Sequence, residues 1–238
     1  MPLDDISNQG FLPFNFNTNT SILNPQDPNN LRRYNYGNAD YDTRHYCSLN
    51  YVWDTPKLSG WRGVLASWTV SGTLFARTGY PLTVVDSNAT SILNGYNYGT
   101  NTTGGFNIFA NYPSGAPITC DSGAVTTPCL TTAQFSPAAA GFGQQRRNQV
   151  YGPHYFDTDL TVMKNFKQPI NEVSTFGIGL QFFNILNHPN FDQPVYGIAD
   201  PSFGTIINTV SVPTSILGSF LGADVSPRLI QIKASLRF

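Results

Sequence analysis

The most regular pattern in the chain is the alternation of apolar and polar residues over its last ten positions. The apolar positions of this segment are Ile230, Ile232, Ala234, Leu236 and Phe238. Because successive side chains of a β-strand point to opposite faces, such a segment is apolar on one face and polar on the other. Its length of about ten residues suits a tilted strand that crosses a bilayer. The pattern is therefore typical of a transmembrane barrel strand, although an edge strand of a soluble β-sandwich would show the same alternation.

Similar alternation predicts four further strands upstream. We expect an all-β, antiparallel meander of about five transmembrane strands, at about 44–54, 67–78, 154–165, 174–186 and 228–238. The connections between these strands are in turn short, long, short and long. Transmembrane barrels have tight periplasmic turns and long extracellular loops, so this order supports a barrel whose C-terminus lies at the periplasm.

Turn residues dominate the rest of the chain. Residues 1–42 are rich in Asn, Pro and Asp and are expected to form an extracellular loop segment, followed by the barrel part at 43–238. From about Thr78 to Val150 the sequence shows no sustained periodicity, and we interpret this segment as a long external loop.

The composition does not alter the predicted fold, but it excludes several classes of protein. Charged residues make up only 11% of the chain, against roughly 25% in ordinary soluble domains. The formal net charge of −1 gives no basic footprint, so a nucleic-acid partner is not expected. No run of about 18 apolar residues predicts a membrane helix, so if the chain crosses a membrane, strands must cross it.

The first residues, from Met1 to Asn8, contain neither a basic region nor an apolar stretch and do not read as a secretory signal. An outer-membrane protein needs such a signal. We therefore expect the chain to be the tail of a longer protein, placed in the bacterial outer membrane by a signal peptide that lies upstream.

Three cysteines also bear on the compartment. Cys120 and Cys129 enclose a turn-rich stretch and are expected to form a disulfide in an oxidising compartment. Cys47 lies within an expected strand and is interpreted as a small apolar side chain that stays reduced.

Aromatic residues gather near the expected strand ends, for example at Trp53, Trp61, Trp68, Tyr151 and Tyr155. Rings with a polar tip favour the bilayer interface, where an apolar body meets water. The same residues could equally fill a protein core, so this feature alone leaves both interpretations open.

The sequence offers few candidates for catalytic or metal-binding residues. The histidines His45, His154 and His188 lack the spacing of metal ligands, so we expect no metal site and no cofactor. Asp157 and Asp159 lie two positions apart on one face of an expected strand and could pass for a catalytic pair. In a barrel they would be lumen-facing polar positions, and we expect no enzyme activity.

Longer sequence motifs indicate which protein family the chain resembles. Five segments carry the resemblance: Tyr41-Asp-Thr-Arg-His45, Trp68 to Thr83, Phe156 to Phe166, Leu180-Gln-Phe-Phe-Asn-Ile-Leu-Asn-His-Pro-Asn-Phe191 and Pro227 to Phe238. Together they resemble the C-terminal end of TonB-dependent outer-membrane receptors of the Oar-like type, which carry a carboxypeptidase-regulatory-like domain. The resemblance covers about residues 31–238, and the run from Phe183 to Phe191 is its most specific part.

The resemblance implies a plug domain followed by a barrel of about 22 strands, of which this chain would supply the last five. It also implies partners: outer-membrane lipid, the rest of its own barrel and plug, and TonB, which would be contacted only through the missing N-terminal part. In this family the barrel-assembly machinery recognises the terminal strand, and the matching residues here are Ile230, Ile232, Leu236 and Phe238. A fragment of this kind would form barrel wall and extracellular loops without transporting alone.

Two other functions remain open from the sequence. One is a soluble secreted β-rich binding module or adhesin, which would need no detergent. The other is a secreted β-fold hydrolase, for which Asp157 and Asp159 are the only paired carboxylates on offer.

Overall fold

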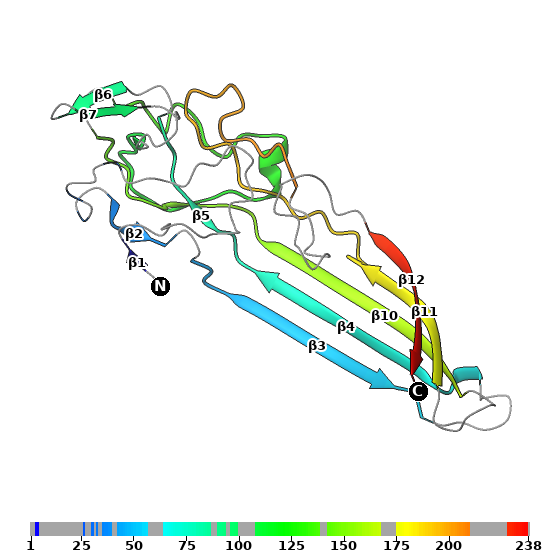
Figure 1. Ribbon diagram of the computed structural model, residues 1–238. Helices are drawn as coiled ribbons and strands as arrows, with labels where there is room; N and C mark the ends of the chain where they lie inside the picture. Colours follow the sequence, from blue (N-terminus) through cyan, green and yellow to red (C-terminus); the bar gives the residue numbers. More distant parts are fainter. Residues whose placement is uncertain are drawn as a thin grey trace.

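A computed structural model shows an elongated molecule made almost entirely of strands and loops (Figure 1). The residues that the structure describes are 3–4, 26, 30, 32, 35–39, 42–56, 64–86, 90–93, 96–99, 108–138, 142–167, 175–209 and 228–237.

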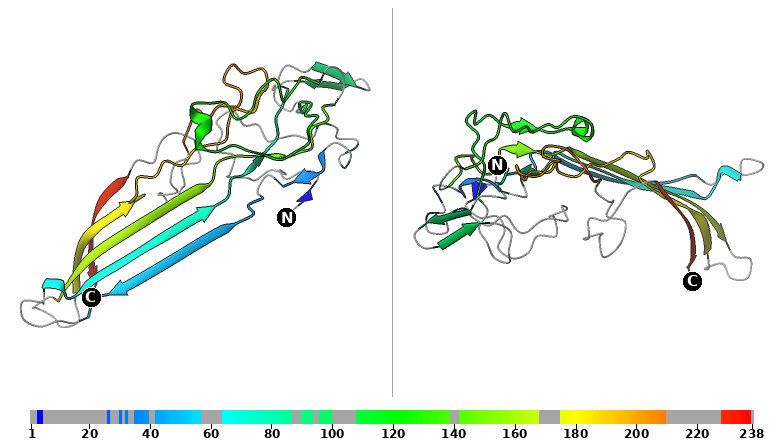
Figure 2. Two further views of the ribbon diagram at one scale, coloured as in Figure 1. Left: turned by 180° about the vertical axis from the view of Figure 1, so that it is seen from behind. Right: turned by 90° about the horizontal axis from the view of Figure 1, so that it is seen from above.

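The long strands form one five-stranded sheet of order β12-β11-β10-β4-β3. Its members are β3 (Tyr46–Asp54), β4 (Trp68–Arg77), β10 (Tyr155–Lys167), β11 (Thr175–Phe183) and β12 (Leu229–Arg237). Every neighbouring pair is antiparallel. All five strands stand where the alternation places them, within three residues at each end. Figure 2 shows β10, β11 and β12 curving toward the end of the sheet that carries the C-terminus.

One strand end differs from the expectation. Residues 184–186 were expected to continue the strand that begins near 174, but β11 ends at Phe183. Asn184 leaves the strand with a φ of 47°, and its side chain both accepts from the backbone N–H of His188 and donates to the carbonyl of His188. An asparagine that bonds its own downstream backbone forms a turn in place of a ladder.

A second structural unit lies at the opposite end of the sheet from the C-terminus (Figure 1). We call it the loop layer, and its residues are 78–86, 108–138, 142–154 and 184–209. It contains a small sheet in which β9 (Val150–Tyr151) pairs antiparallel with β5 (Pro81–Leu82) and parallel with β8 (Ile118–Thr119). Two further short antiparallel pairs join β6 (Thr90–Leu93) to β7 (Tyr96–Gly99) and β1 (Leu3–Asp4) to β2 (Gly37–Asn38).

The loop layer holds the hydrophobic core of the described chain. The buried residues of this core are Leu82, Val84, Ala110, Tyr112, Cys120, Leu130, Phe135, Val150, Ile198 and Phe203. The ring of Phe135 is fully buried, stacks on Tyr112 at 4.6 Å between centroids, and meets Phe203 edge-on at 6.0 Å. The connection expected from about 78 to 150 is thus long, as predicted, but its described part contains short strands and a core, because distant segments pack on one another here.

Part of the N-terminal segment is held against this layer. Gln26 is fully buried, and its side-chain oxygen accepts from the backbone N–H groups of Phe109 and Gly143. Its side-chain nitrogen donates to the carbonyl of Gly143. Most of the expected loop segment 1–42 lies outside the described residues. In the part of the chain that the structure describes, none of the helical segments could span a bilayer.

Candidate functional site: the two faces of the sheet

The register of the sheet sorts the side chains by polarity. Val70 lies opposite Val162, and Leu180 lies opposite both Val162 and Ile232. We call this side the apolar face; its members are Cys47, Leu49, Tyr51, Trp53, Trp68, Val70, Gly72, Leu74, Ala76, Phe156, Thr158, Leu160, Val162, Lys164, Phe166, Phe176, Ile178, Leu180, Phe182, Ile230, Ile232, Ala234 and Leu236. A one-residue slip of any strand would move its apolar set to the other side.

The apolar face is open to its surroundings. Ile232 is 75% exposed, Trp53 is 59% exposed and Leu180 is 41% exposed. A water-soluble sheet covers such a face with another layer, because exposed apolar area of this extent is unfavourable in water. Among the described residues no element covers the middle of this face, so its outward side chains suit a hydrocarbon solvent.

The opposite side, which we call the polar face, is closely packed beside two glycines of β11. Its glycines Gly177 and Gly179 lie across from Asn165 and Met163 on β10. A Cβ added at Gly177 would lie 2.7 Å from the Ser235 hydroxyl oxygen and 2.9 Å from the Asn165 side-chain oxygen. The two glycines therefore leave room on the polar face for the side chains of the neighbouring strands.

Asp157 and Asp159 both lie on the polar face, opposite Phe75 and Thr73 of β4. Asp159 accepts hydrogen bonds from the backbone N–H of Asn184 at 3.1 Å and from the Thr73 hydroxyl at 3.5 Å. The first bond ties β10 to the turn after β11, and the second ties it to β4. Among the described residues the pair is not part of a group of three His, Cys, Asp or Glu side chains that could hold a metal ion.

The three histidines do not form a ligand set. His154 and His188 approach one another with ring centroids 6.2 Å apart, and His45 lies at the start of the first long strand. Within the described ranges no group of three His, Cys, Asp or Glu residues could hold a metal ion.

The junction between the sheet and the loop layer is closely packed. The Arg77 guanidinium, at the end of β4, lies 3.8 Å from the ring centroid of Tyr80 and 5.1 Å from that of Tyr155. Asp192 is buried beside this junction. Burial raises the pKa of Asp192 to about 6, although the N–H of Gln193 and the charge of Arg77 favour its ionised form.

Cys120 and Cys129 form a disulfide within the loop layer, with Cα atoms 5.5 Å apart. Cys120 belongs to the buried core. The residues between them form a short 3-10 helix, η2 (Ser122–Val125), whose first turn is capped by the Asp121 carboxylate, which accepts from the N–H of Gly123 at 2.8 Å. Cys47 is free and exposed on the apolar face.

The expected assembly residues lie on the outermost strand. Ile230, Ile232 and Leu236 are on the apolar face of β12 and are between 54% and 75% exposed. β12 pairs with β11 on one side only, so its other edge is open in the described sheet. Phe238 lies outside the described residues.

The aromatic residues divide between the two units. Trp53 and Trp68 are on the apolar face, and Trp61 lies outside the described residues. Tyr151 is buried in the loop layer, where its hydroxyl accepts from the Arg44 guanidinium and the Asn38 amide, each at 2.7 Å. Of the two interpretations left open for these aromatic residues, Tyr151 therefore agrees with a place in a protein core, because its ring is enclosed by protein.

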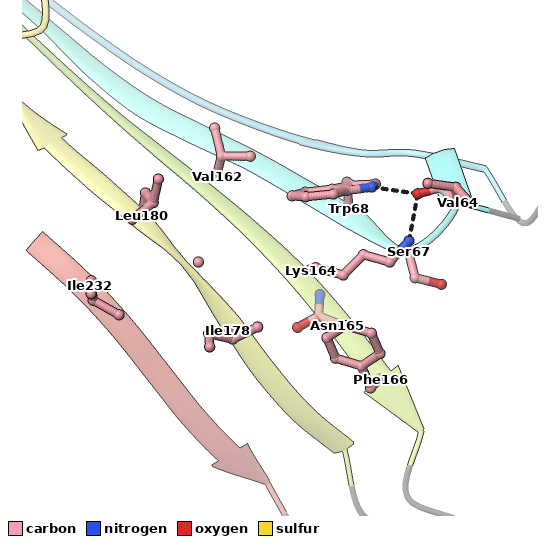
Figure 3. A pocket seen from close by; sticks show the side chains of 11 residues that line it. Val64, Ser67, Trp68, Val162, Lys164, Asn165, Phe166, Ile178, Leu180 and Ile232 are labelled. Atoms are coloured by element: carbon pink, nitrogen blue, oxygen red, sulfur yellow. Dashed lines mark hydrogen bonds between the residues drawn. The ribbon is translucent and has the colours of Figure 1, made fainter.

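Sequence reasoning missed a groove on the apolar face, next to the short connection between β3 and β4. This groove, which we call the rim groove, has a volume of about 1090 Å³ and is lined by Val64, Ser67, Trp68, Val162, Lys164, Asn165, Phe166, Ile178, Gly179, Leu180 and Ile232. Figure 3 shows that the lining side chains come from the turn before β4 and from β4, β10, β11 and β12. The signal in the sequence was Lys164, a charged residue at an apolar position of the alternation.

Comparison with known families gives one match. The model of a family described as "Outer membrane beta barrel domain" matches residues 6–231 of this chain. No curated protein matches the chain, and no solved structure does.

Proposed function

The chain belongs to the outer membrane beta barrel domain family, and we propose that its sheet is a continuous arc of the wall of a larger barrel. Membership of this family implies the bacterial outer membrane as its location. The single observation that carries the proposal is the register of the sheet, which gathers apolar side chains on one face and leaves them exposed. That arrangement is stable only where hydrocarbon bathes the apolar face.

Strand direction indicates what completes the wall. In a row of five antiparallel strands the first and the last run in the same direction, so β3 and β12 are parallel to each other. An antiparallel barrel can close across these edges only if the remaining wall contains an odd number of strands. A barrel of about 22 strands would need about 17 more, which satisfies this condition.

The finer assignment is to a TonB-dependent receptor of the Oar-like type. It rests on the resemblance of the motifs, above all Phe183 to Phe191. In this proposal the sheet forms part of the barrel wall, and the loop layer lies outside the cell. Neither unit transports a substrate on its own, and neither is catalytic. Outer-membrane lipid contacts the apolar face, the plug and the other strands complete the barrel, and TonB acts through a part of the receptor outside this chain.

We also propose that β12 is the strand that the barrel-assembly machinery reads. Its open edge offers backbone hydrogen bonds, and the alternate side chains Ile230, Ile232 and Leu236 give specificity, as in strand addition generally. Deletion of Phe238 should lower the amount of surface-labelled barrel far more than Arg237→Ala does. Equal amounts of the two variants at matched expression would show that the terminal aromatic is not recognised during assembly.

Membrane extraction and protease access test the proposed wall. The barrel that contains this chain should stay in the outer-membrane pellet after alkaline and high-salt washes and dissolve only in detergent. On intact cells, added trypsin should cut in the loop layer at the exposed Arg146 and spare Lys164 in the sheet. A monodisperse protein in buffer without detergent would favour the soluble binding module or adhesin in its place.

A further inference from the structure

The connection between β3 and β4 ends in a turn with exposed apolar side chains. Val64 and Leu65 are 72% and 60% exposed. Together with Ala66 and Ser67 they form a segment that we call the rim turn. Turns in water favour Gly, Pro, Asn, Asp and Ser, whose side chains or conformations suit them. Two adjacent aliphatic residues that stay exposed are unfavourable in water, so this turn suits apolar surroundings.

The rim turn lies beside the apolar face of the sheet. Val64 and Ser67 line the rim groove together with Ile178 of β11 and Ile232 of β12. Both isoleucines belong to the apolar face, and Figure 3 shows Val64 next to Trp68 on the same side. The exposed apolar surface of the turn is therefore continuous with the apolar face.

Two carbonyl oxygens of the rim turn accept hydrogen bonds from side chains. The Lys164 ammonium donates to the carbonyls of Val64 at 2.7 Å and Ala66 at 2.5 Å. The Val64 oxygen also accepts from the indole N–H of Trp68 at 2.8 Å (Figure 3). In hydrocarbon no water reaches a backbone carbonyl, so an irregular turn is tolerated there only where protein groups supply the donors. The rim turn meets this condition at both carbonyls.

The last residue of the turn is held by the backbone of β10. The carbonyl of Ser67 accepts from the N–H of Asn165 at 2.9 Å, and Ser67 has a φ of 61°. A residue other than glycine is uncommon in this left-handed region and persists where its surroundings hold it. Two successive residues of β10, Lys164 and Asn165, thus bind the turn and keep Val64 beside the apolar face.

We propose that the rim turn is immersed in the periplasmic leaflet of the outer membrane, with Val64 and Leu65 among the lipid acyl chains, and that Lys164 holds it there. The inference rests on the proposed membrane location of the sheet. Continuity identifies the occupant, because the turn extends an apolar face that lipid covers in that proposal. The turn then fixes the depth of the wall, since a shift toward the periplasm would move both side chains into water.

Fluorescence quenching of the barrel that contains this chain, reconstituted in vesicles, tests this inference. In a Cys47→Ser background a single cysteine replaces Leu65 and carries a fluorophore. Its fluorescence should be largely lost in vesicles of lipids brominated on their acyl chains, and aqueous iodide should leave it unchanged. Asp54→Cys is the matched control, since Asp54 is exposed at the other end of the same connection, on the polar face. Its label should respond to iodide alone.

The variant Lys164→Met tests whether the lysine holds the turn. Methionine keeps a long apolar side chain but cannot donate to the carbonyls of Val64 and Ala66. The label at position 65 should then lose much of its quenching by brominated lipid and become accessible to iodide. Lys233→Met is the matched control, because Lys233 lies on the polar face of β12, and it should leave the label in lipid.

A label at Leu180 separates this inference from the proposed wall. If brominated lipid quenches the label at Leu180 while the label at Leu65 responds to iodide, the rim turn lies in water and only this inference is wrong. A label at Leu65 that neither quencher reaches would also overturn it, because protein would then cover the turn. So would unchanged lipid quenching in Lys164→Met. A label at Leu180 that brominated lipid does not quench contradicts the proposed wall itself.

Discussion

The sheet and the loop layer are organised by opposite rules. In the loop layer apolar residues such as Val84, Leu130 and Phe135 have no exposed surface. In the sheet Leu49, Ile232 and Leu236 are more than half exposed. The loop layer behaves as a small soluble domain whose core is inside, whereas the sheet places its apolar residues outside. The difference shows that one chain is adapted to two solvents, water around the loops and hydrocarbon around the strands.

The largest expected effect concerns the core of the loop layer. Phe135→Ala should cost about 3–5 kcal/mol of local stability, because it removes a fully buried ring that contacts Tyr112 and Phe203. Hydrogen exchange should speed up at the backbone amides of Ala110 and Cys120. Phe176→Ala on the apolar face is the control and should cost much less, since lipid chains fill the space that its half-exposed ring leaves. Similar costs at the two sites would erase the contrast between the units.

The next effect distinguishes the two faces of the sheet. Leu180→Arg should destabilise the barrel by about 2–4 kcal/mol, the range for a cation on the lipid side near the bilayer midplane. Gln181→Arg, one residue away on the polar face, should change stability little. Urea unfolding in lipid vesicles measures both. Equal losses would mean that the face bearing Leu180 does not contact lipid.

Loss of the disulfide should affect one unit only. The loop closed between Cys120 and Cys129 spans about ten residues, so Cys120→Ser with Cys129→Ser should remove about 2–3 kcal/mol from the loop layer in the entropic model. Exchange of sheet amides such as Val162 should stay as it was. Cys47→Ser is the matched control and should be neutral, and loss of sheet protection in the double variant would contradict the independence of the two units.

The smallest expected effect is a dependence on pH. The pKa of Asp192 is raised to about 6 by burial, so the folded loop layer binds a proton more tightly than the unfolded chain does. Its stability should therefore rise by about 2 kcal/mol as the pH falls from 7.5 to 4.5. Asp192→Asn should remove this component and stabilise the layer at pH 7.5. The exposed Asp200 offers the control, because Asp200→Asn should leave the pH dependence intact.

The sequence predicts the sheet well because the alternation of apolar and polar side chains in a strand involves only residues close together in the chain. In β12 the alternation from Ile230 to Leu236 is enough to identify the strand and its faces. Pairing then follows the same rule, since the register that places Ile232 beside Leu180 is also the one that keeps polar residues together. The end of β11 does not follow this rule. The side chain of Asn184 forms a turn there, and a turn has no periodic pattern of apolar and polar residues.

The loop layer could not be predicted in the same way. Its contacts join residues far apart in the chain: Val85 pairs with Phe109 and with Gly197, and the N–H of Cys129 donates to the carbonyl of Gly204. The spacing of residue types along the sequence does not predict such contacts. The rim groove could not be predicted for a related reason, because Lys164 donates to the carbonyls of Val64 and Ala66, which lie 100 and 98 residues earlier in the chain.

The central claim is that the apolar face contacts lipid, and cysteine scanning along β11 from Phe176 to Phe183 tests it most directly. In a Cys47→Ser background each tested position receives a single cysteine, labelled with a fluorophore in the membrane-embedded barrel. Labels at Phe176, Ile178, Leu180 and Phe182 should be quenched by a lipid-soluble quencher. Labels at Gln181 and Phe183, on the polar face, should respond only to a water-soluble one. Gly177 and Gly179 are left unchanged, because a Cβ there would collide with neighbouring atoms. A continuous response without alternation, or quenching of all positions from water alone, would contradict the account.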